Sequence, residues 1–286
     1  LKALRPAWEA ERAAAEAFNR DATGPLRRGV GVASGWYGCG NTSLPNPSTI
    51  KAGIRADGAI VLHQGAMDIG QGANTVITQI FATALGVPVA GIGLIGPDTD
   101  LTPDAGKTSA SRQTFVSGNA ARLCGAALRA EVLRAVNASD QALLSVADGA
   151  ITVDDGASRH RIALGPLAAD GDGYVFAASG HYDPPTKPLD ENGQGEPYAQ
   201  FGYAAQLAVA EVDTRLGTVR LLRLVAAHDV GLAVNPMLVE GQIQGGVAQG
   251  VGWALNEEYV YGPDGGLENA SFLDYRMPVA SDLPML

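Results

Sequence analysis

The sequence predicts an α+β fold of two lobes, each with mixed β-sheet packed against helices. Three observations favour this class. Two segments with β-like alternation each lead into a glycine-containing loop and then into a helical pattern. These segments lie in different halves of the chain and share similar loops, Asp-Ile-Gly at 68–70 and Asp-Val-Gly at 229–231. The stretch between them contains short β-like runs and prolines. We therefore expect an internal duplication, with one copy in each lobe.

The first lobe is predicted to cover residues 1–138 and to begin with an amphipathic helix over 2–19. Apolar residues recur there at helical spacing, namely Leu4, Trp8, Ala15 and Phe18. A β-hairpin is predicted over 48–62, because Asp-Gly at 57–58 between alternating residues is a strong turn signal.

Two helices and an intervening buried strand are predicted after this hairpin. The first helix runs from about 74 to 85 and stops at Gly86, since glycine commonly follows a helix C-terminus. The second runs from about 113 to 136. Its Gly118 and Gly125 permit close approach of another backbone.

The rest of the chain is predicted to form a small β insertion with a linker, residues 139–190, and the second lobe, residues 191–286. In the second lobe, two paired strands over 201–213 and 219–225 lead into a helix that ends near Leu255. This helix carries four glycines, each of which weakens an isolated helix by about 1 kcal/mol relative to alanine. We therefore expect the helix to be buried against a close neighbour in the complete protein, and its glycine side over 241–250 to be exposed in the isolated chain.

Two loops of the first lobe are candidate anion-binding sites. Residues 65–75 open the first helix, and residues 98–115 lead into the second. Glycine lets backbone N–H groups approach a ligand, and a helix N-terminus offers free N–H donors with a partial positive charge. Two such sites in one short segment predict one large anionic ligand held in several places.

Composition and charge disfavour several classes of protein. A net charge of −10 and a pI near 4.8 argue against binding to the phosphate backbone of nucleic acid. The two cysteines, Cys39 and Cys124, form no zinc or iron–sulfur spacing. They could pair with each other, but a reduced cytoplasmic interior is the simpler expectation. No secretory signal and no apolar stretch long enough to span a bilayer are present in the sequence, so no membrane span is expected.

The sequence lacks a complete P-loop and a complete serine-hydrolase motif. Gly-Lys-Thr-Ser at 106–109 resembles the end of a phosphate-binding P-loop, but Leu101 stands where that motif requires glycine. A serine hydrolase would need a Gly-x-Ser-x-Gly elbow, and the sequence contains none. Both enzyme classes are therefore disfavoured.

Three short patterns follow one another along the chain. They are Gly70-Gln71-Gly72 with Thr75, the run from Thr108 to Arg112 with Gly118-Asn119-Ala120, and Asn235-Pro236 with Glu240-Gly241-Gln242. Together they resemble the molybdenum-cofactor-binding domain of the xanthine dehydrogenase and aldehyde oxidase family. The run Gly-Gln-Gly-x-Pro-Tyr at 193–198, which leads into a strand, resembles that family's purine- and nicotinate-hydroxylating branch. The resemblance covers nearly the whole chain.

The resemblance implies cofactor-binding roles for three groups of residues. Gln71 matches a glutamine that reaches the pterin and the oxo region of the metal. Residues 109–113 match the turn that holds the pterin and its phosphate or dinucleotide, and Gln242 matches a glutamine that bonds the pterin ring from the other lobe. The complete set is Gly70, Gln71, Gly72, Thr75, Thr108, Ser109, Ala110, Ser111, Arg112, Gln113 and Gln242. For Gln71 a plain helix-capping role is the alternative, and for Arg112 a structural pairing with Asp104.

No residue is assigned as a metal ligand or as the catalytic base. The run Gly193-Gln194-Gly195-Glu196-Pro197 looks like the family's loop that carries a basic glutamate. It precedes the strand over 201–213, whereas the family's loop comes near the C-terminus of the subunit. The base is therefore expected beyond Leu286, and the chain is expected to be a fragment.

The resemblance also implies a function. The chain is expected to bind molybdopterin with molybdenum, as the cytosine dinucleotide, in a cleft between its lobes. The enzyme would oxidise N-heterocycles or aldehydes with oxygen from water. Its expected partners are the preceding half of the molybdenum subunit, an iron–sulfur subunit and a flavin subunit with FAD. The alternative is a split subunit or assembly module without activity of its own, and the isolated chain is expected to be inactive.

Overall fold

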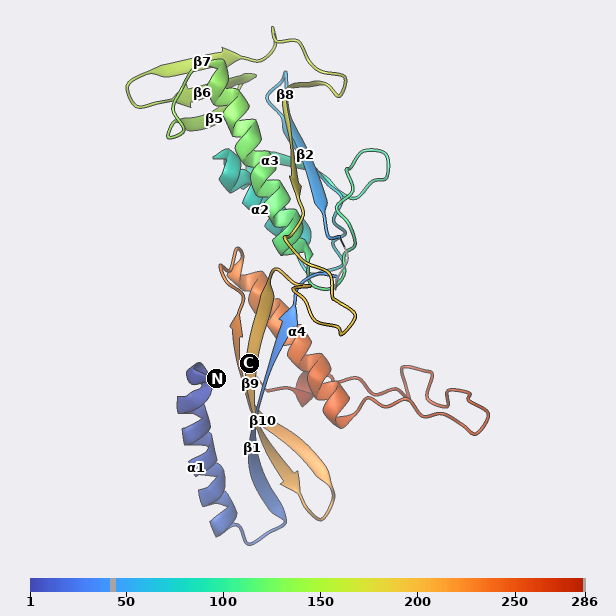
Figure 1. The fold of residues 1–286 in the computed structure, drawn as a ribbon. Coiled ribbons are helices and arrows are strands. Elements are labelled where there is room, and N and C mark those ends of the chain that lie inside the picture. Colours follow the sequence, from blue (N-terminus) through green and yellow to red (C-terminus); the bar gives the residue numbers. More distant parts are fainter. Residues whose placement is uncertain (42–44, 285–286) are drawn as a thin grey trace. The chain divides into compact units, whose positions relative to one another are not determined.

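The computed structural model describes residues 1–41 and 45–284, which form a mixed α+β structure (Figure 1). This confirms the predicted fold class. The helices are α1 (Arg5–Asp21), α2 (Ala73–Leu85), α3 (Gln113–Ala135) and α4 (Pro236–Leu255). Contacts within the chain divide it into two compact units. We call Leu1–Tyr37 with Gly202–Leu286 unit 1, and Gly38–Phe201 unit 2.

Unit 2 contains a four-stranded sheet in the order β4-β3-β2-β8. Its strands are β2 (Ser48–Arg55), β3 (Ile60–Gln64), β4 (Ile92–Ile95) and β8 (Tyr174–Tyr182). The antiparallel pairing of β2 with β3 confirms the predicted hairpin, and β4 runs parallel to β3. The connection from β3 to β4 passes through α2, as a parallel pair requires a crossover.

The helices α2 and α3 lie against each other, and α3 packs on β2 and β8. Small residues make this packing close. A Cβ at Gly125 would lie 2.7 Å from the carbonyl oxygen of Phe81, and one at Gly180 on β8 would overlap the carbonyl oxygen of Ala120. The close approach predicted for the flank of α3 is therefore confirmed.

A second sheet of unit 2 is antiparallel, in the order β5-β6-β7. Its strands are β5 (Leu143–Ala147), β6 (Ala150–Asp154) and β7 (Arg159–Ala163). These short strands lie where the β insertion is predicted. The next strand, β8, falls in the same predicted segment but pairs with β2, with Ile50 opposite Gly180.

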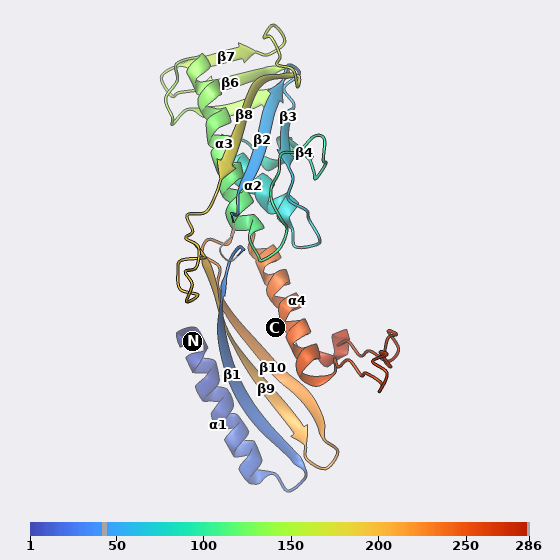
Figure 2. The same cartoon turned by 45° about the vertical axis from the view of Figure 1, so that its right-hand side comes forward.

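Unit 1 consists of a three-stranded sheet in the order β1-β9-β10, with α1 and α4 on its two sides (Figure 2). Its strands are β1 (Leu26–Gly38), β9 (Phe201–Asp213) and β10 (Thr218–Asp229). One core cluster joins Leu4 to Leu207, and another joins Leu224 to Val247. Because side chains alternate along a strand, the two clusters fill opposite faces of the sheet.

The compact units have other boundaries than the predicted lobes 1–138, 139–190 and 191–286. The reason is pairing between distant parts of the chain, since β1 joins β9 and β10 in one sheet. The N-terminal helix consequently belongs with the C-terminal strands. The division of cofactor binding between the predicted lobes stays a prediction.

The helix α4 shows the exposed glycine side that is expected of this chain by itself. Within the described residues, no atom lies within 4 Å of a Cβ built at four of its glycines. These are Gly241, Gly245, Gly246 and Gly250. The glycine-bearing side of α4 is therefore open within unit 1, while Val247, Val251 and Gly252 are buried. None of the described helices is long and apolar enough to cross a membrane.

Candidate functional site

The two glycine-containing loops of unit 2 lie side by side. The backbone N–H of Met67 donates to Thr108 Oγ1 at 3.0 Å, and that hydroxyl donates to the Met67 carbonyl oxygen at 3.2 Å. Gly65 runs so close to the second loop that a Cβ would lie 2.5 Å from the carbonyl oxygen of Pro103. The structure thus brings the loop after β3 and the loop before α3 together, as one ligand held by both would require.

Asp68 organises the first loop. Its carboxylate accepts hydrogen bonds from the backbone N–H groups of Gly70 at 2.9 Å, Asn74 at 3.0 Å and Gly72 at 3.3 Å. These bonds, the one from Gly70 first, hold the pKa of Asp68 below its ordinary value. The donors expected to be free for an anion at the start of α2 are therefore partly satisfied within the chain. The Asp-Ile-Gly pattern carried this signal, because aspartate commonly bonds the backbone two residues on.

The side chain of Gln71 hydrogen-bonds the backbone of its own loop. Its Oε1 accepts the N–H of Ile69 at 2.7 Å, and its Nε2 donates to the Met67 carbonyl oxygen at 3.0 Å. The side chain is half-buried, and Thr75 in the next turn is exposed. Gly70 has a φ of 107°, a conformation that favours glycine, and no atom lies within 4 Å of its built Cβ. The loop therefore offers an open backbone beside a carboxamide.

The second loop contains strained backbone. Ala110 and Ser111 both have a φ of 53°, in the left-handed region that residues with a Cβ rarely adopt. Each such residue costs about 1–3 kcal/mol and is typical of ligand sites. Gly40 donates its N–H to the Ala110 carbonyl oxygen at 2.9 Å and so supports the turn. The side chains of Ser109 and Ser111 are exposed, which leaves their hydroxyls accessible.

Arg112 and Gln113 point inward instead. Arg112 is only 1% exposed, and its guanidinium donates to four backbone carbonyl oxygens. Gln113 donates to the Lys107 carbonyl oxygen at 2.9 Å and accepts the hydroxyl of Ser117. Burial lowers the pKa of Arg112, which the charges of acidic neighbours oppose. Sequence reasoning expected this guanidinium to donate to phosphate or to pair with Asp104. The structure places it under the loop, and its contact with a cofactor stays a prediction.

Gln242 belongs to a different compact unit from the other predicted residues. It is exposed on α4 of unit 1, whereas the rest of the set is in unit 2. The helix begins as predicted, because Asn235 Oδ1 accepts the N–H of Leu238 at 3.2 Å. In the preceding loop, Asp229 accepts the N–H of Gly231 at 3.0 Å. Asp68 makes the same bond in unit 2, so the two proposed repeats share this local geometry.

Glu196 sits in an exposed turn. Its carboxylate pairs with Lys187 Nζ at 2.5 Å, and its carbonyl oxygen accepts the N–H of Lys187 at 2.8 Å. The hydrogen bond from Lys187 lowers the pKa of Glu196. A general base works best with a pKa near the operating pH, so this environment does not favour Glu196 as one.

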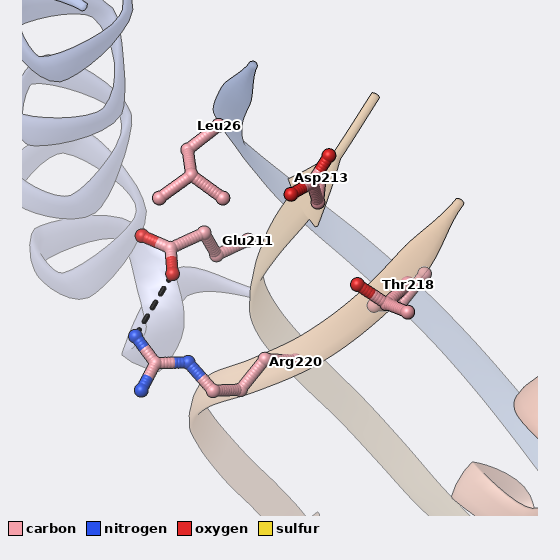
Figure 3. Close-up of a pocket in the computed structure, with 6 residues that line it drawn as sticks. Leu26, Glu211, Asp213, Thr218 and Arg220 are labelled. Carbon is pink, nitrogen blue, oxygen red and sulfur yellow. Dashed lines mark hydrogen bonds and ion pairs between the residues drawn. The ribbon is translucent and has the colours of Figure 1, made fainter. Parts of the chain in front are cut away.

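A shallow pocket of about 230 Å³ lies on unit 1, at the end of its sheet (Figure 3). Glu211 there is nearly buried and pairs with Arg220 at 2.8 Å and Arg28 at 3.0 Å. None of the predicted site residues lines this pocket. Among the described residues, no group of three His, Cys, Asp or Glu side chains could hold a metal ion.

Comparison with known proteins identifies the family. A family model described as a molybdopterin cofactor-binding domain matches residues 3–284. The chain belongs to this family. It is 34% identical over its whole length to a xanthine dehydrogenase molybdenum-binding subunit of Escherichia coli O157:H7, of which it covers 38%. It is 32% identical, over 79% of its length, to subunit gamma of the 6-hydroxypseudooxynicotine dehydrogenase complex of Paenarthrobacter nicotinovorans, of which it covers 28%.

A solved structure agrees with this assignment. The aldehyde oxidoreductase of Desulfovibrio desulfuricans ATCC 27774 matches 99% of this chain with a TM-score of 0.78 and 28% identity. The chain covers 28% of that protein. It therefore spans less than two fifths of the length of these relatives.

The residues of the two joined loops fit a molybdopterin. A pterin with a phosphate or dinucleotide needs backbone N–H groups, hydroxyls and little side-chain bulk around it. The open backbone at Gly70, the exposed hydroxyls of Ser109 and Ser111, and the left-handed turn at Ala110 meet these needs.

Proposed function

We propose that this chain holds molybdopterin, as the cytosine dinucleotide, within a hydroxylase that oxidises N-heterocycles or aldehydes with oxygen from water. The observation that carries the proposal is the junction of the two loops through Thr108 and Met67. When bound, the cofactor supplies the redox centre at which the substrate carbon is oxidised, while the protein binds and orients it.

Each loop contributes a different kind of group. The hydroxyls of Ser109 and Ser111, with the backbone N–H groups of the left-handed turn, bind the pterin and its phosphate. Gln71 offers both a donor and an acceptor from one carboxamide, which suits a pterin ring. Gly70 and Gly72 keep side-chain bulk away, and Thr108 fixes the spacing between the loops. Gln242 bonds the pterin from α4.

The names of the relatives support the substrate class and the partners. Two relatives are named for nitrogen-containing compounds: xanthine, for a protein 34% identical to this chain, and 6-hydroxypseudooxynicotine, for one 32% identical. An aldehyde oxidase of Cavia porcellus is 28% identical to this chain. Two of these relatives are named as subunits. We therefore propose that this chain works within a larger assembly. From the family resemblance we further propose partners that complete the molybdenum subunit and carry iron–sulfur clusters and FAD, in the cytoplasm.

The test uses the full-length protein that contains this chain, produced with its partners in a molybdenum-replete host. Elemental analysis should give molybdenum near one atom per chain, and the released pterin should carry a cytosine nucleotide. Oxidation of xanthine, nicotinate and an aromatic aldehyde is then followed with an artificial electron acceptor. A protein without molybdenum or pterin would overturn the proposal. A loaded protein that oxidises none of these substrates would favour an assembly module instead.

A further inference from the structure

Arg112 is the largest of the fully buried side chains, and it is charged. Burying a charge costs several kcal/mol unless it is paired and hydrogen-bonded. Among the described residues, no carboxylate lies within ion-pair distance of its guanidinium. Something other than a salt bridge must therefore offset the cost of burial.

Backbone carbonyl groups accept its hydrogens, and the negative charges of Asp104 and Asp183 favour the charged form in addition. Nη1 donates to the carbonyl oxygens of Ala105 at 2.7 Å and Lys107 at 3.0 Å. Nη2 donates to those of Asn46 at 2.6 Å and Pro47 at 2.7 Å. A guanidinium carries two hydrogens on each Nη, so all four have an acceptor. Only Nε is buried without a partner.

The guanidinium lies close against Gly106. A Cβ at Gly106 would lie 2.7 Å from Nη1, and the φ of this residue is 66°. Two features therefore require glycine at position 106: the left-handed backbone conformation and the close approach of the Arg112 side chain. The guanidinium of Arg112 consequently bonds the carbonyl oxygens on both sides of Gly106, those of Ala105 and Lys107.

We infer that Arg112 is a positioning residue that anchors the loop over 105–111 to residues 46–47 from beneath. It does not bind phosphate itself. The anchor keeps the left-handed pair Ala110 and Ser111 in the geometry that the ligand meets. The identity of that ligand rests on the proposed function, but the anchoring of the loop does not.

The shape of the side chain matters more than its charge. Arginine presents its donors in a flat, rigid fork, whereas lysine presents three hydrogens on one nitrogen. Lysine would keep the charge but leave carbonyl oxygens of the two segments without a donor. If Arg112 instead attracted a ligand phosphate by its charge, lysine would keep part of that attraction and the loop would stay in place.

The test compares Arg112→Ala and Arg112→Lys with Arg129→Ala in the full-length protein with its partners. Arg129 is a matched control, because it lies on α3, the helix that Arg112 directly precedes, and also donates to backbone carbonyl oxygens, those of Leu85 and Asp140 at 3.1 Å. We measure the pterin and molybdenum content, the melting temperature, and hydrogen exchange of the 105–111 amides after the cofactor is removed.

Both Arg112 variants should lose at least tenfold in cofactor content and exchange the 105–111 amides at least tenfold faster. Arg129→Ala should melt at a lower temperature yet keep its cofactor and its slow exchange at 105–111. Full cofactor content in Arg112→Lys, or unchanged exchange in Arg112→Ala, would overturn the inference.

A second variant keeps the inference testable if Arg112→Ala fails to fold. Gly106→Ala forces the guanidinium from its place and should reproduce the loss of cofactor and the faster exchange. Normal cofactor content and exchange in Gly106→Ala would count against the anchor. If the wild-type protein holds no molybdopterin but the variants still exchange faster at 105–111, the proposed function fails and the anchor stands.

Discussion

Asp68 and Arg112 carry opposite charges, and each bonds the backbone of one loop of the candidate site. Asp68 accepts hydrogen bonds from backbone N–H groups, and Arg112 donates hydrogen bonds to backbone carbonyl oxygens. The glycines and the Gly-Gln-Gly pattern could be recognised in the sequence. The burial of Arg112 could not, because arginine is seldom fully buried and two of its acceptors, at Asn46 and Pro47, lie about 65 positions away in the chain.

Gln71→Ala should lower the molybdenum and pterin content several-fold while the protein stays folded. In the structure the carboxamide bonds only Ile69 and Met67 of its own loop, so its loss should cost about 1 kcal/mol of folding stability. Metal analysis and thermal melting of the full-length protein check both parts. Unchanged metal content with a large drop in melting temperature would favour the capping role.

Asp68→Ala should lower the free energy of unfolding by about 1–2 kcal/mol, comparable to losing a side chain that accepts backbone N–H groups at the start of a helix. The folded-state pKa of Asp68 lies below the ordinary 3.8, so its stabilising effect is fully present above that pH. The effect is lost as the pH falls through the lower, folded-state pKa.

Urea unfolding of the wild type and of Asp68→Ala from pH 7 to pH 2 measures this effect. The difference between them should be constant above about pH 5 and shrink below pH 3.8. A difference that grows toward acid pH would contradict the role assigned to the carboxylate.

Local signals predicted most helices and hairpins correctly. The Asp-Gly turn, the glycine after α2 and the Asn235 cap act over a few residues, so the sequence carries them directly. The pairing of strands that lie far apart in the chain could not be predicted from the sequence. The joining of β8 to β2 and of β1 to β9 depends on tertiary packing, which no short pattern encodes.

Gly180→Ala should destabilise unit 2 by about 1–3 kcal/mol, since the added methyl overlaps the backbone of α3 at Ala120. Gly31→Ala is the matched control. That glycine also lies in a strand, and no atom is within 4 Å of its built Cβ. Equal urea midpoints for the two variants would show that α3 and β8 are not packed as closely as described.

At the scale of the whole molecule, the chain spans 38% of the relative with which it shares 34% identity over its full length. Its family and α+β class were recognisable because the Gly-Gln-Gly and Ser-Ala-Ser-Arg patterns occur in order along it. The two compact units could not be recognised from the sequence, because the chain leaves unit 1 after β1 and returns to it at β9.

The chain produced by itself should give no turnover with xanthine, nicotinate or an aromatic aldehyde. Its one glutamate in a family-like loop, Glu196, is exposed and paired with Lys187, and it is not assigned as a base. The full-length assembly serves as the positive control. Turnover by the chain alone that disappears in Glu196→Gln would make Glu196 the base after all.

The central claim is that the two joined loops hold one cofactor together. Hydrogen exchange of the full-length protein, with and without its cofactor, tests it most directly at residues 65–72 and 105–111. The account predicts that both segments become protected together when the cofactor is bound, while the distant sheet of β5, β6 and β7 does not change. A loaded protein in which neither loop gains protection would contradict it.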